Sequence, residues 1–259
     1  MNTETRPKRP SRPEIKVYGQ NACRALWESR AESIIRVYVT PDKVKIFGTL
    51  LKWCAKNKKA YHVLEAPELE KVSASVHHEG IVILAQEKPF LDEGSLLPKL
   101  AKSPKGAAAL YFDGVKNPHN IGSILRVAAH FGVPVALGRQ GELNRLTPAA
   151  LRVAEGGAEH VELCPLAHPE KTLTSLAKSG WPLIATSSHE GQSLYETELP
   201  THGIFAVGNE VSGMSPKLMR AADLLIKIPG TGSVESLNVA ACASILLAEH
   251  WRQHHGKKS

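Results

Sequence analysis

Residues 203–238 read GIFAVGNEVSGMSPKLMRAADLLIKIPGTGSVESLN, an alternation of apolar runs, polar loops and one short helical segment. The apolar runs are short and nearly continuous, which is typical of strands buried on both faces of a parallel sheet. Ser215 followed by Pro216 marks the start of the helix between them. Open parallel sheets bind ligands at the carboxyl ends of their strands. This stretch therefore predicts an α/β domain with a site in its two glycine-containing loops.

The same alternation of strand and helix extends over residues 107–255. Thr147 and Pro148 are expected at the N-cap and first position of one of the helices. We therefore assign residues 107–255 to a single parallel-sheet α/β domain. The expected strands are AALYFDGV, PVALG, HVELCPL, PLIATSS, GIFAVGNE and LLIKIPG, and the expected helices are NIGSILRVAAHFG, TPAALRVAEGG, PEKTLTSLAKSG, SPKLMRAA and SLNVAACASILLAEHWRQ.

The N-terminal part of the chain has a different organisation. Residues 15–88 show helical spacing in NACRALWESR and KIFGTLLKWCAKNK and apolar strands in IIRVYVT, AYHVL and GIVILAQ, so they predict a small α/β domain. Residues 89–106 predict a linker with one short helical segment. Residues 1–14 are basic and rich in proline, which predicts a disordered tail, and residues 256–259 form a second tail.

Composition narrows the functional classes. The formal net charge of +7 favours phosphate-bearing partners, although many basic proteins bind no nucleic acid. The basic tail and a lysine-rich helix offer phosphate contacts, and a solvated helix face is the alternative interpretation. Neither a secretory signal nor a membrane-length apolar run is present, so no membrane partner is expected. The basic residues in question are Arg6, Lys8, Arg9, Arg12, Lys52, Lys56, Lys58 and Lys59.

The cysteines and histidines predict no metal site. The four cysteines lie far apart without a CxxC pair, which is typical of buried thiols in a reducing compartment, so we expect a cytoplasmic protein. His62, His77 and His78 together with Cys54 fit no zinc-ligand spacing. The cysteines are Cys23, Cys54, Cys164 and Cys242.

Three loops at predicted strand ends combine glycines with polar residues: DGVKNPHNIGSILR, VGNEVSGM and IPGTGSVESLN. A dinucleotide fold would carry GxGxxG after its first strand, and a phosphate-binding P-loop would carry GK followed by Ser or Thr; both patterns are absent. Any single glycine here is explained by a tight turn. In the first loop, Asn120 is expected at the helix N-cap, and Arg126 lies in an otherwise apolar helix. A guanidinium there needs a carboxylate such as Glu210, or it points into a site.

Together, NPHNIGSILRVAAHFG, VGNEVSGMSP and IPGTGSVESLNVAACASILL resemble the three motifs of the SpoU/TrmH family of SPOUT-class RNA methyltransferases. VYGQNACRAL and HHEGIVIL resemble the start and end of the L30e-like RNA-binding domain that many members carry. The resemblance implies a SPOUT domain with a deep trefoil knot, an exception to the usual absence of knots. It also implies a homodimer in which an arginine of one subunit lies near the cofactor of the other.

The resemblance further implies which residues form the site. It assigns S-adenosyl-L-methionine as the cofactor and ribosomal or transfer RNA as the substrate. Many members carry Asp at the position of Asn117, a residue not usually assigned to catalysis. The implied catalytic residues are Asn120, Arg126, Glu210, Ser236 and Asn238. The implied cofactor-binding residues are Thr186, Ser187, Gly208, Ile228 and Leu237.

A ribose hydroxyl must lose its proton as it accepts a methyl group, so the reaction needs a positioned base. The resemblance suggests Arg126 for that role, but a guanidinium is a poor proton acceptor, which favours a simpler role in which its donors orient the phosphate and the 2′-hydroxyl. Two alternatives stay open. Instead of a ribose 2′-O-methyltransferase, the chain could be a catalytically silent RNA-binding homologue or a methyltransferase of the same fold that acts on a base nitrogen.

Overall fold

The computed structural model describes residues 13–143, 145–209 and 213–256. The chain divides into two compact units between Pro89 and Phe90, and each unit is described separately. No helix within those described ranges is long and apolar enough to cross a membrane.

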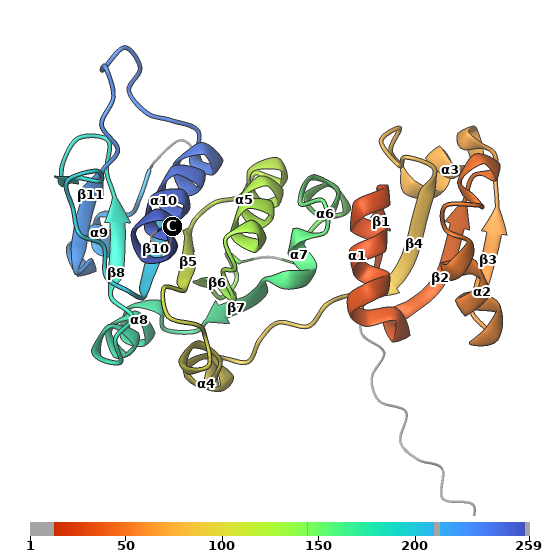
Figure 1. Ribbon diagram of the computed structural model, residues 1–259, viewed down its shortest axis with the longest axis horizontal. Helices are drawn as coiled ribbons and strands as arrows, with labels where there is room; N and C mark the ends of the chain where they lie inside the picture. The colour runs from red at the N-terminus through yellow and green to blue at the C-terminus, as the bar shows by residue number, and fades with distance from the viewer. Residues whose placement is uncertain (1–12, 144, 210–212, 257–259) are drawn as a thin grey trace, which may run out of the picture. The chain divides into compact units, whose positions relative to one another are not determined.

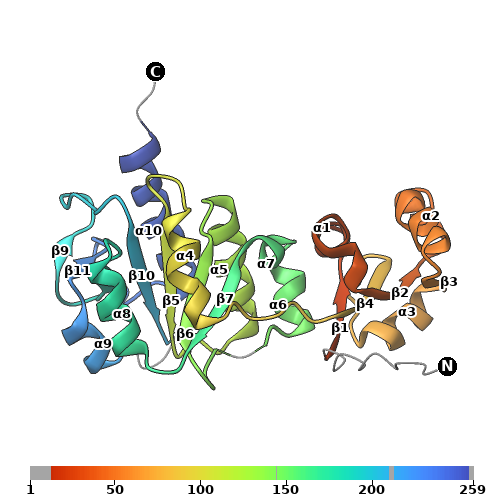
Figure 2. The ribbon, with the colours of Figure 1, turned by 90° about the horizontal axis from the view of Figure 1, so that it is seen from below.

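The first unit is a four-stranded sheet with the order β1-β4-β2-β3, in which only β2 and β3 are parallel. Helices α1 and α2 lie on one face of this sheet and α3 lies on the other (Figure 2). The sequence did not predict β1 or α3, because EIKVY carries two charges and APELEKVS has little apolar periodicity. The elements are β1 (Glu14–Tyr18), α1 (Gln20–Arg30), β2 (Ile34–Val39), α2 (Gly48–Lys56), β3 (Ala60–Val63), α3 (Ala66–Ser73) and β4 (Ile81–Gln86).

The second unit contains a seven-stranded parallel sheet with the order β7-β6-β5-β10-β8-β11-β9. The parallel α/β domain predicted from the alternating pattern is thereby confirmed. The strands are β5 (Ala108–Asp113), β6 (Val135–Arg139), β7 (Glu162–Leu166), β8 (Leu183–Thr186), β9 (Gln192–Ser193), β10 (Gly203–Gly208) and β11 (Leu224–Lys227).

Helices cover both faces of this sheet, which explains the continuous apolar runs in its strands (Figure 1). On one face, α4, α8 and α9 contribute leucines to a core cluster that includes Tyr111 and Trp181. On the other face, α5 packs against α6, α7 and α10. The helices are α4 (Leu96–Ala101), α5 (Pro118–His130), α6 (Pro148–Val153), α7 (Gly157–His160), α8 (Pro169–Lys178), α9 (Pro216–Ala221) and α10 (Val239–His255).

Two segments differ from the sequence-based expectation. Leu96 and Leu100, within the predicted linker, are 1% exposed and belong to the core of the second unit. The helix expected over TPAALRVAEGG ends at Val153, because Glu155 and Gly156 adopt positive φ values of 51° and 91°, and a second helix, α7, begins at Gly157. Thr147 caps α6 as expected, with its hydroxyl accepting a hydrogen bond from the amide of Ala150.

Candidate active site

The centre of the parallel sheet is a topological switch point. Strand β5 is followed along the chain by β6 and β7, which lie on one side of it, whereas β10 on its other side adjoins β8. The loops after β5 and β10 therefore leave neighbouring strand ends and continue toward opposite sides of the sheet. Ligands of open α/β sheets bind in the crevice that such loops form. The first and second loops singled out in the sequence flank this point.

Two side chains that the sequence analysis did not select fasten these loops together. The Asn209 side-chain amide donates to the Gly114 carbonyl oxygen at 2.8 Å, and the Asp113 carboxylate accepts from the Ser215 amide at 2.6 Å. Asn209 and Gly213 also exchange two backbone hydrogen bonds of 2.9 and 3.0 Å. In the sequence, Asp113 and Asn209 stand out only as polar residues at or directly after the end of a strand. Many turns share that feature, so it does not identify a contact between loops.

The first and third loops meet at a pair of asparagines. Asn238 is the N-cap of α10, where its side-chain oxygen accepts from the Ala240 amide at 2.8 Å. Its Nδ2 donates to Oδ1 of Asn120 at 3.1 Å. The Asn238 side chain thus caps α10 and, at the same time, holds the start of α10 against the start of α5. Two of the predicted catalytic residues lie in direct contact.

The prediction that Asn120 is an N-cap is wrong. Asn117 caps α5, and its Oδ1 accepts from the His119 amide at 2.9 Å. Pro118 occupies the first helical position, where its missing N–H costs no hydrogen bond, so the cap falls on the residue before it. Asn120 lies within the first turn, and its side chain is therefore available to Asn238.

The third loop presents its main chain to solvent. Residues 229–238 are all exposed, among them Ser236, and Leu237 is 44% exposed. A Cβ built on Gly230 or Gly232 would meet no atom within 4 Å. The amides of residues 230–237 make no backbone–backbone hydrogen bond with any described residue, although the Ser233 amide donates to the Thr231 hydroxyl and the Leu237 carbonyl accepts from the Cys242 thiol. The other main-chain donors and acceptors of this loop are open to a polar ligand.

The end of β8 lies beside the third loop. Thr186 pairs with Ile226 of β11, and the Ser187 amide donates to the Ile226 carbonyl at 3.0 Å. The Ser187 hydroxyl accepts from the amides of residues 189 and 190, so it shapes its own turn. Nε2 of His189 lies 3.8 Å from Oε1 of Glu235 in the third loop. Thr186 and Ser187 therefore border the same edge of the sheet as Leu237 and Ile228.

Arg126 lies apart from the paired asparagines. It is exposed on α5 and forms neither a hydrogen bond nor an ion pair with the described part of the chain. Of the two expectations for this guanidinium, its exposure on α5 agrees with a side chain that points into a site, and the pairing with Glu210 stays a prediction. Glu210, its expected partner, is outside the described residues. Six helical residues separate Arg126 from Asn120 by about 9 Å along the axis and about 120° around it.

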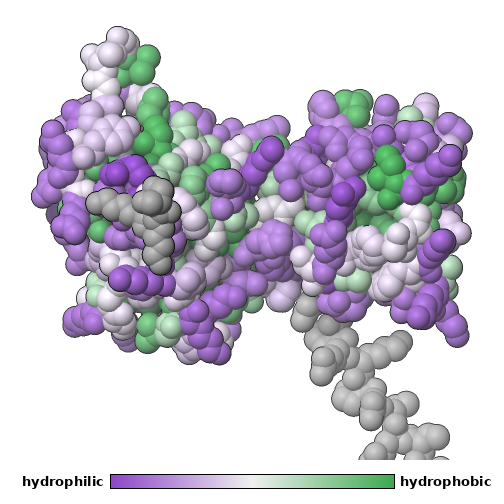
Figure 3. All heavy atoms as spheres, in the orientation of Figure 1, coloured by the Kyte–Doolittle hydropathy of each residue, from purple (hydrophilic) through white to green (hydrophobic). Residues whose placement is uncertain are grey.

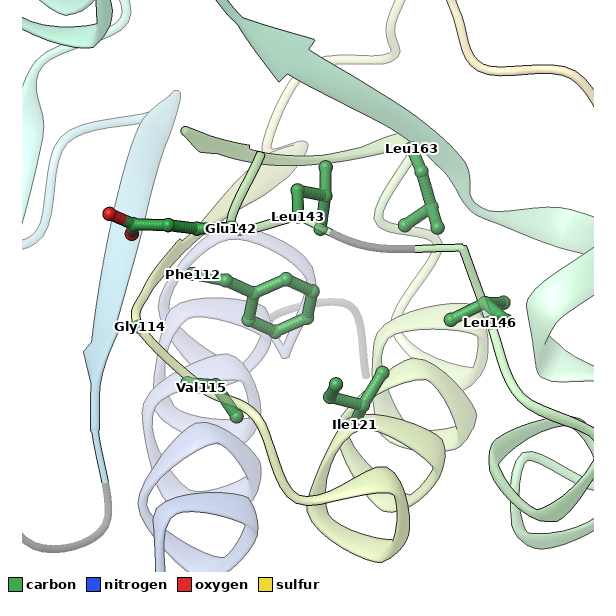
Figure 4. A pocket seen from close by; sticks show the side chains of 8 residues that line it. All are labelled: Phe112, Gly114, Val115, Ile121, Glu142, Leu143, Leu146 and Leu163. Carbon is green, nitrogen blue, oxygen red and sulfur yellow. The ribbon is translucent and has the colours of Figure 1, made fainter. Parts of the chain in front are cut away.

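A small apolar pocket lies next to the first loop (Figure 4). Phe112, Val115, Ile121 and three leucines line it, and the Glu142 carboxylate at its edge points away from the apolar lining. Its volume of about 10 Å³ has room for one water molecule. The pocket is therefore too small for a nucleoside, and the open strand-end loops remain the better candidate site.

Two cations near this edge are neutralised within the fold. Lys217 and Arg139 each lie 2.8 Å from the Glu170 carboxylate, and the hydrogen bonds from Lys217, its own backbone and Arg139 lower the pKa of Glu170 to about 2. Within the described residues, no three His, Cys, Asp or Glu side chains gather in a way that could hold a metal ion. All four cysteines are free thiols, of which Cys242 is only half-buried.

Comparison with known proteins agrees with this arrangement. The model of the SpoU rRNA Methylase family matches residues 107–248, which span all three loops. The chain belongs to the SpoU rRNA methylase family. A second model, described as RNA 2′-O ribose methyltransferase substrate binding, matches residues 16–91. Both matches agree with the SpoU/TrmH resemblance seen in the motifs.

Individual SpoU relatives extend over nearly the whole chain. It is 37% identical to the uncharacterized tRNA/rRNA methyltransferase YfiF of Escherichia coli O157:H7, over 93% of this chain and 69% of that protein. It is 32% identical to the 23S rRNA (guanosine-2′-O-)-methyltransferase RlmB of Coxiella burnetii, over 92% and 95%. The crystal structure of the SpoU methyltransferase AviRb from Streptomyces viridochromogenes, in complex with AdoMet, has the same fold, with a TM-score of 0.74 and 21% identity over 93% and 90% of the two chains.

Proposed function

We propose that this SpoU-family chain transfers the methyl group of S-adenosyl-L-methionine to a ribose 2′-hydroxyl of ribosomal or transfer RNA. The observation that carries the proposal is the contact between Asn120 and Asn238, which joins the first and third loops at the strand ends. Within the family match, the relatives named RlmB act on the 2′-oxygen of guanosine in 23S rRNA, which supports ribose rather than a base nitrogen.

The open main chain of the third loop fits a nucleoside-bearing cofactor, because most of its backbone donors and acceptors make no hydrogen bond with the described residues and are open to such a ligand. Thr186, Ser187, Gly208, Ile228 and Leu237 would hold it. The sulfonium supplies an activated methyl group, so the remaining task of the protein is alignment.

The proposed catalytic residues divide this task. Asn238 and Asn120 fix the two loops, and Ser236, exposed beside them, is positioned to bond the ribose or the phosphate. The guanidinium of Arg126 orients the phosphate and the 2′-hydroxyl through its planar donors. Glu210, outside the described residues, is assigned to hold that guanidinium.

The different directions of Asn120 and Arg126 on α5 support a homodimer. If Asn120 serves the site of its own chain, Arg126 points about 120° away from it and is free to reach the site of a partner. Trp251, 42% exposed on α10 and packed near Phe131 of α5, belongs to the proposed contact surface. We also propose that the chain of the second unit forms a trefoil knot and that the protein is located in the cytoplasm.

The test compares wild type with Arg126→Ala and Asn120→Ala. RNA from cells that lack the protein is incubated with tritiated cofactor, and the methylated nucleosides are identified by mass spectrometry. We expect both variants to lose methyl transfer while calorimetry shows cofactor affinity near that of wild type. Methylated bases in place of 2′-O-methylnucleosides would support the base-nitrogen alternative. Absence of transfer by the wild type would support the silent homologue, and a fully active Arg126→Ala would refute the role of Arg126.

A further inference from the structure

One segment of the first unit carries nearly all the excess charge of the chain. Residues 43–64 contain six lysines and no aspartate or glutamate, whereas the formal net charge of the whole chain is +7. The other residues therefore hold 26 Lys and Arg against 25 Asp and Glu. A basic surface concentrated in this way attracts a polyanion without the opposition of neighbouring carboxylates.

The segment forms two adjoining elements. Its helix α2 is the crossover between the parallel strands β2 and β3, and it packs against β3. Tyr61 and Val63 pair in register with Val37 and Val39, whose side chains are fully buried. Tyr61 and Val63 point to that same face, but they lie on the edge strand and stay 43% and 47% exposed. On the face drawn in Figure 3, hydrophobic atoms of this unit also lie among hydrophilic ones.

The lysines around this face are available for a ligand. Lys45, Lys52, Lys56 and Lys58 are exposed and make no ion pair or hydrogen bond with the described part of the chain. By contrast, Lys43 lies 3.2 Å from the Asp42 carboxylate, and Lys59 donates to a backbone carbonyl. Ile46, 51% exposed just before α2, adds apolar surface beside these cations.

We propose that this α2–β3 face, defined by Ile46, Tyr61, Val63 and the four available lysines, binds an unpaired segment of the RNA substrate. One base stacks on the Tyr61 ring, and the lysines bind the adjoining phosphates. Exposed aromatic rings among cations are the arrangement by which proteins bind single strands, whose bases are free to stack. A solvated helix face alone would explain the lysines but not the exposed tyrosine, valine and isoleucine. The inference rests on the proposed RNA substrate and names how part of it is held.

The experiment measures binding of the full-length protein to a fluorescein-labelled 12-nucleotide RNA and to the duplex of the same sequence. We expect Tyr61→Leu to weaken single-strand binding about tenfold, the range of one lost base–aromatic stack, while duplex binding changes less than twofold. Tyr61→Phe keeps the ring and should bind as wild type. Tyr195→Leu, which removes a tyrosine 57% exposed on the second unit, is the matched control and should have no effect.

The lysines are tested by their salt dependence. Lys52→Ala with Lys56→Ala should weaken both RNAs and lower the slope of log affinity against log salt by about 0.7 per lysine on the single strand. Lys71→Ala, on α3 at the opposite face of the sheet, is the control for charge (Figure 2). Thermal unfolding checks that each variant folds.

Two results would overturn the inference: Tyr61→Leu binding the single strand as tightly as wild type, or losing single strand and duplex equally. Failure of the proposed function has a different signature. In that case the wild type would bind the single strand through Tyr61 but would transfer no methyl group.

Discussion

Replacement of Gly208 by alanine tests whether the end of β10 and the second loop are in contact. A Cβ on Gly208 would lie 2.6 Å from the Gly213 carbonyl carbon and from the Met214 amide nitrogen, whereas ordinary contacts begin at 3.4 Å. The Gly213–Met214 backbone must therefore move by about 0.8 Å. Overpacking of this kind costs about 1–3 kcal/mol. The two backbone hydrogen bonds between Asn209 and Gly213 weaken as well, each worth about 1 kcal/mol.

These effects together predict a loss of about 2–3 kcal/mol in the stability of the second unit. For a domain of this size, such a loss lowers Tm by roughly 4–12 °C. Because Gly208 also borders the proposed cofactor site, we expect S-adenosylmethionine affinity to fall at least about tenfold, or 1.4 kcal/mol. Differential scanning calorimetry and titration calorimetry measure the two quantities.

Gly230→Ala is the matched control for the change in backbone entropy. Its Cβ meets no atom within 4 Å and its φ is not in the left-handed region, so its stability should stay within about 0.5 kcal/mol of wild type. If Gly208→Ala keeps the Tm and the cofactor affinity of the wild type, the close approach of β10 to the second loop is refuted.

Two further predictions concern single side chains. Asn238→Asp should keep the Tm, since aspartate is an equally good N-cap, but should lose the donor to Asn120 and slow methyl transfer several-fold. Methyl transfer by Asn238→Asp at the wild-type rate would contradict a role for this hydrogen bond in the site. Burial and the neighbouring His254 lower the pKa of His250 to about 4 from its ordinary value of 6.5, so the fold keeps this imidazole neutral and loses stability as pH falls from about 6.5 to 4. Urea titrations at pH 7.5 and 4.5 should show the stability advantage of wild type over His250→Gln shrinking at the lower pH, and a constant difference would count against this linkage.

Periodicity predicted most of the second unit because its central strands are buried on both faces and several of its helices have a clear start. It missed β9, a two-residue strand that is not buried, and α7. Thr147 and Ser215 precede prolines at the first helical position, and both cap their helices as expected. Elements without such signals were missed. The helix α3 is mostly polar and is held by a capping box between Glu65 and Glu68.

The site was predictable in its loops but not in its contacts. The motifs located Asn120 and Asn238, yet their hydrogen bond spans 118 positions of sequence and follows only from the order of the strands. Asn209 and Asp113 were missed for the same reason, since their partners come from other loops. The exposure of Arg126 could not be read from its apolar neighbours, because a helix in a packed layer has more than one apolar side.

The packing of α5 fixes the positions of its two proposed catalytic residues, Asn120 and Arg126, relative to each other. A Cβ on Gly122 would lie 2.5 Å from the Ala150 carbonyl oxygen of α6, and one on Gly157 of α7 would lie 2.8 Å from the Leu125 carbonyl oxygen of α5. Backbone thus meets backbone at two points along one face of the helix, without flexible side chains between them. Because α5 is clamped at both points, Arg126 cannot shift without moving Asn120. In the proposed dimer, one rigid helix would then position an asparagine in its own site and an arginine in the partner's site, and the alignment that methyl transfer demands would depend on helix packing.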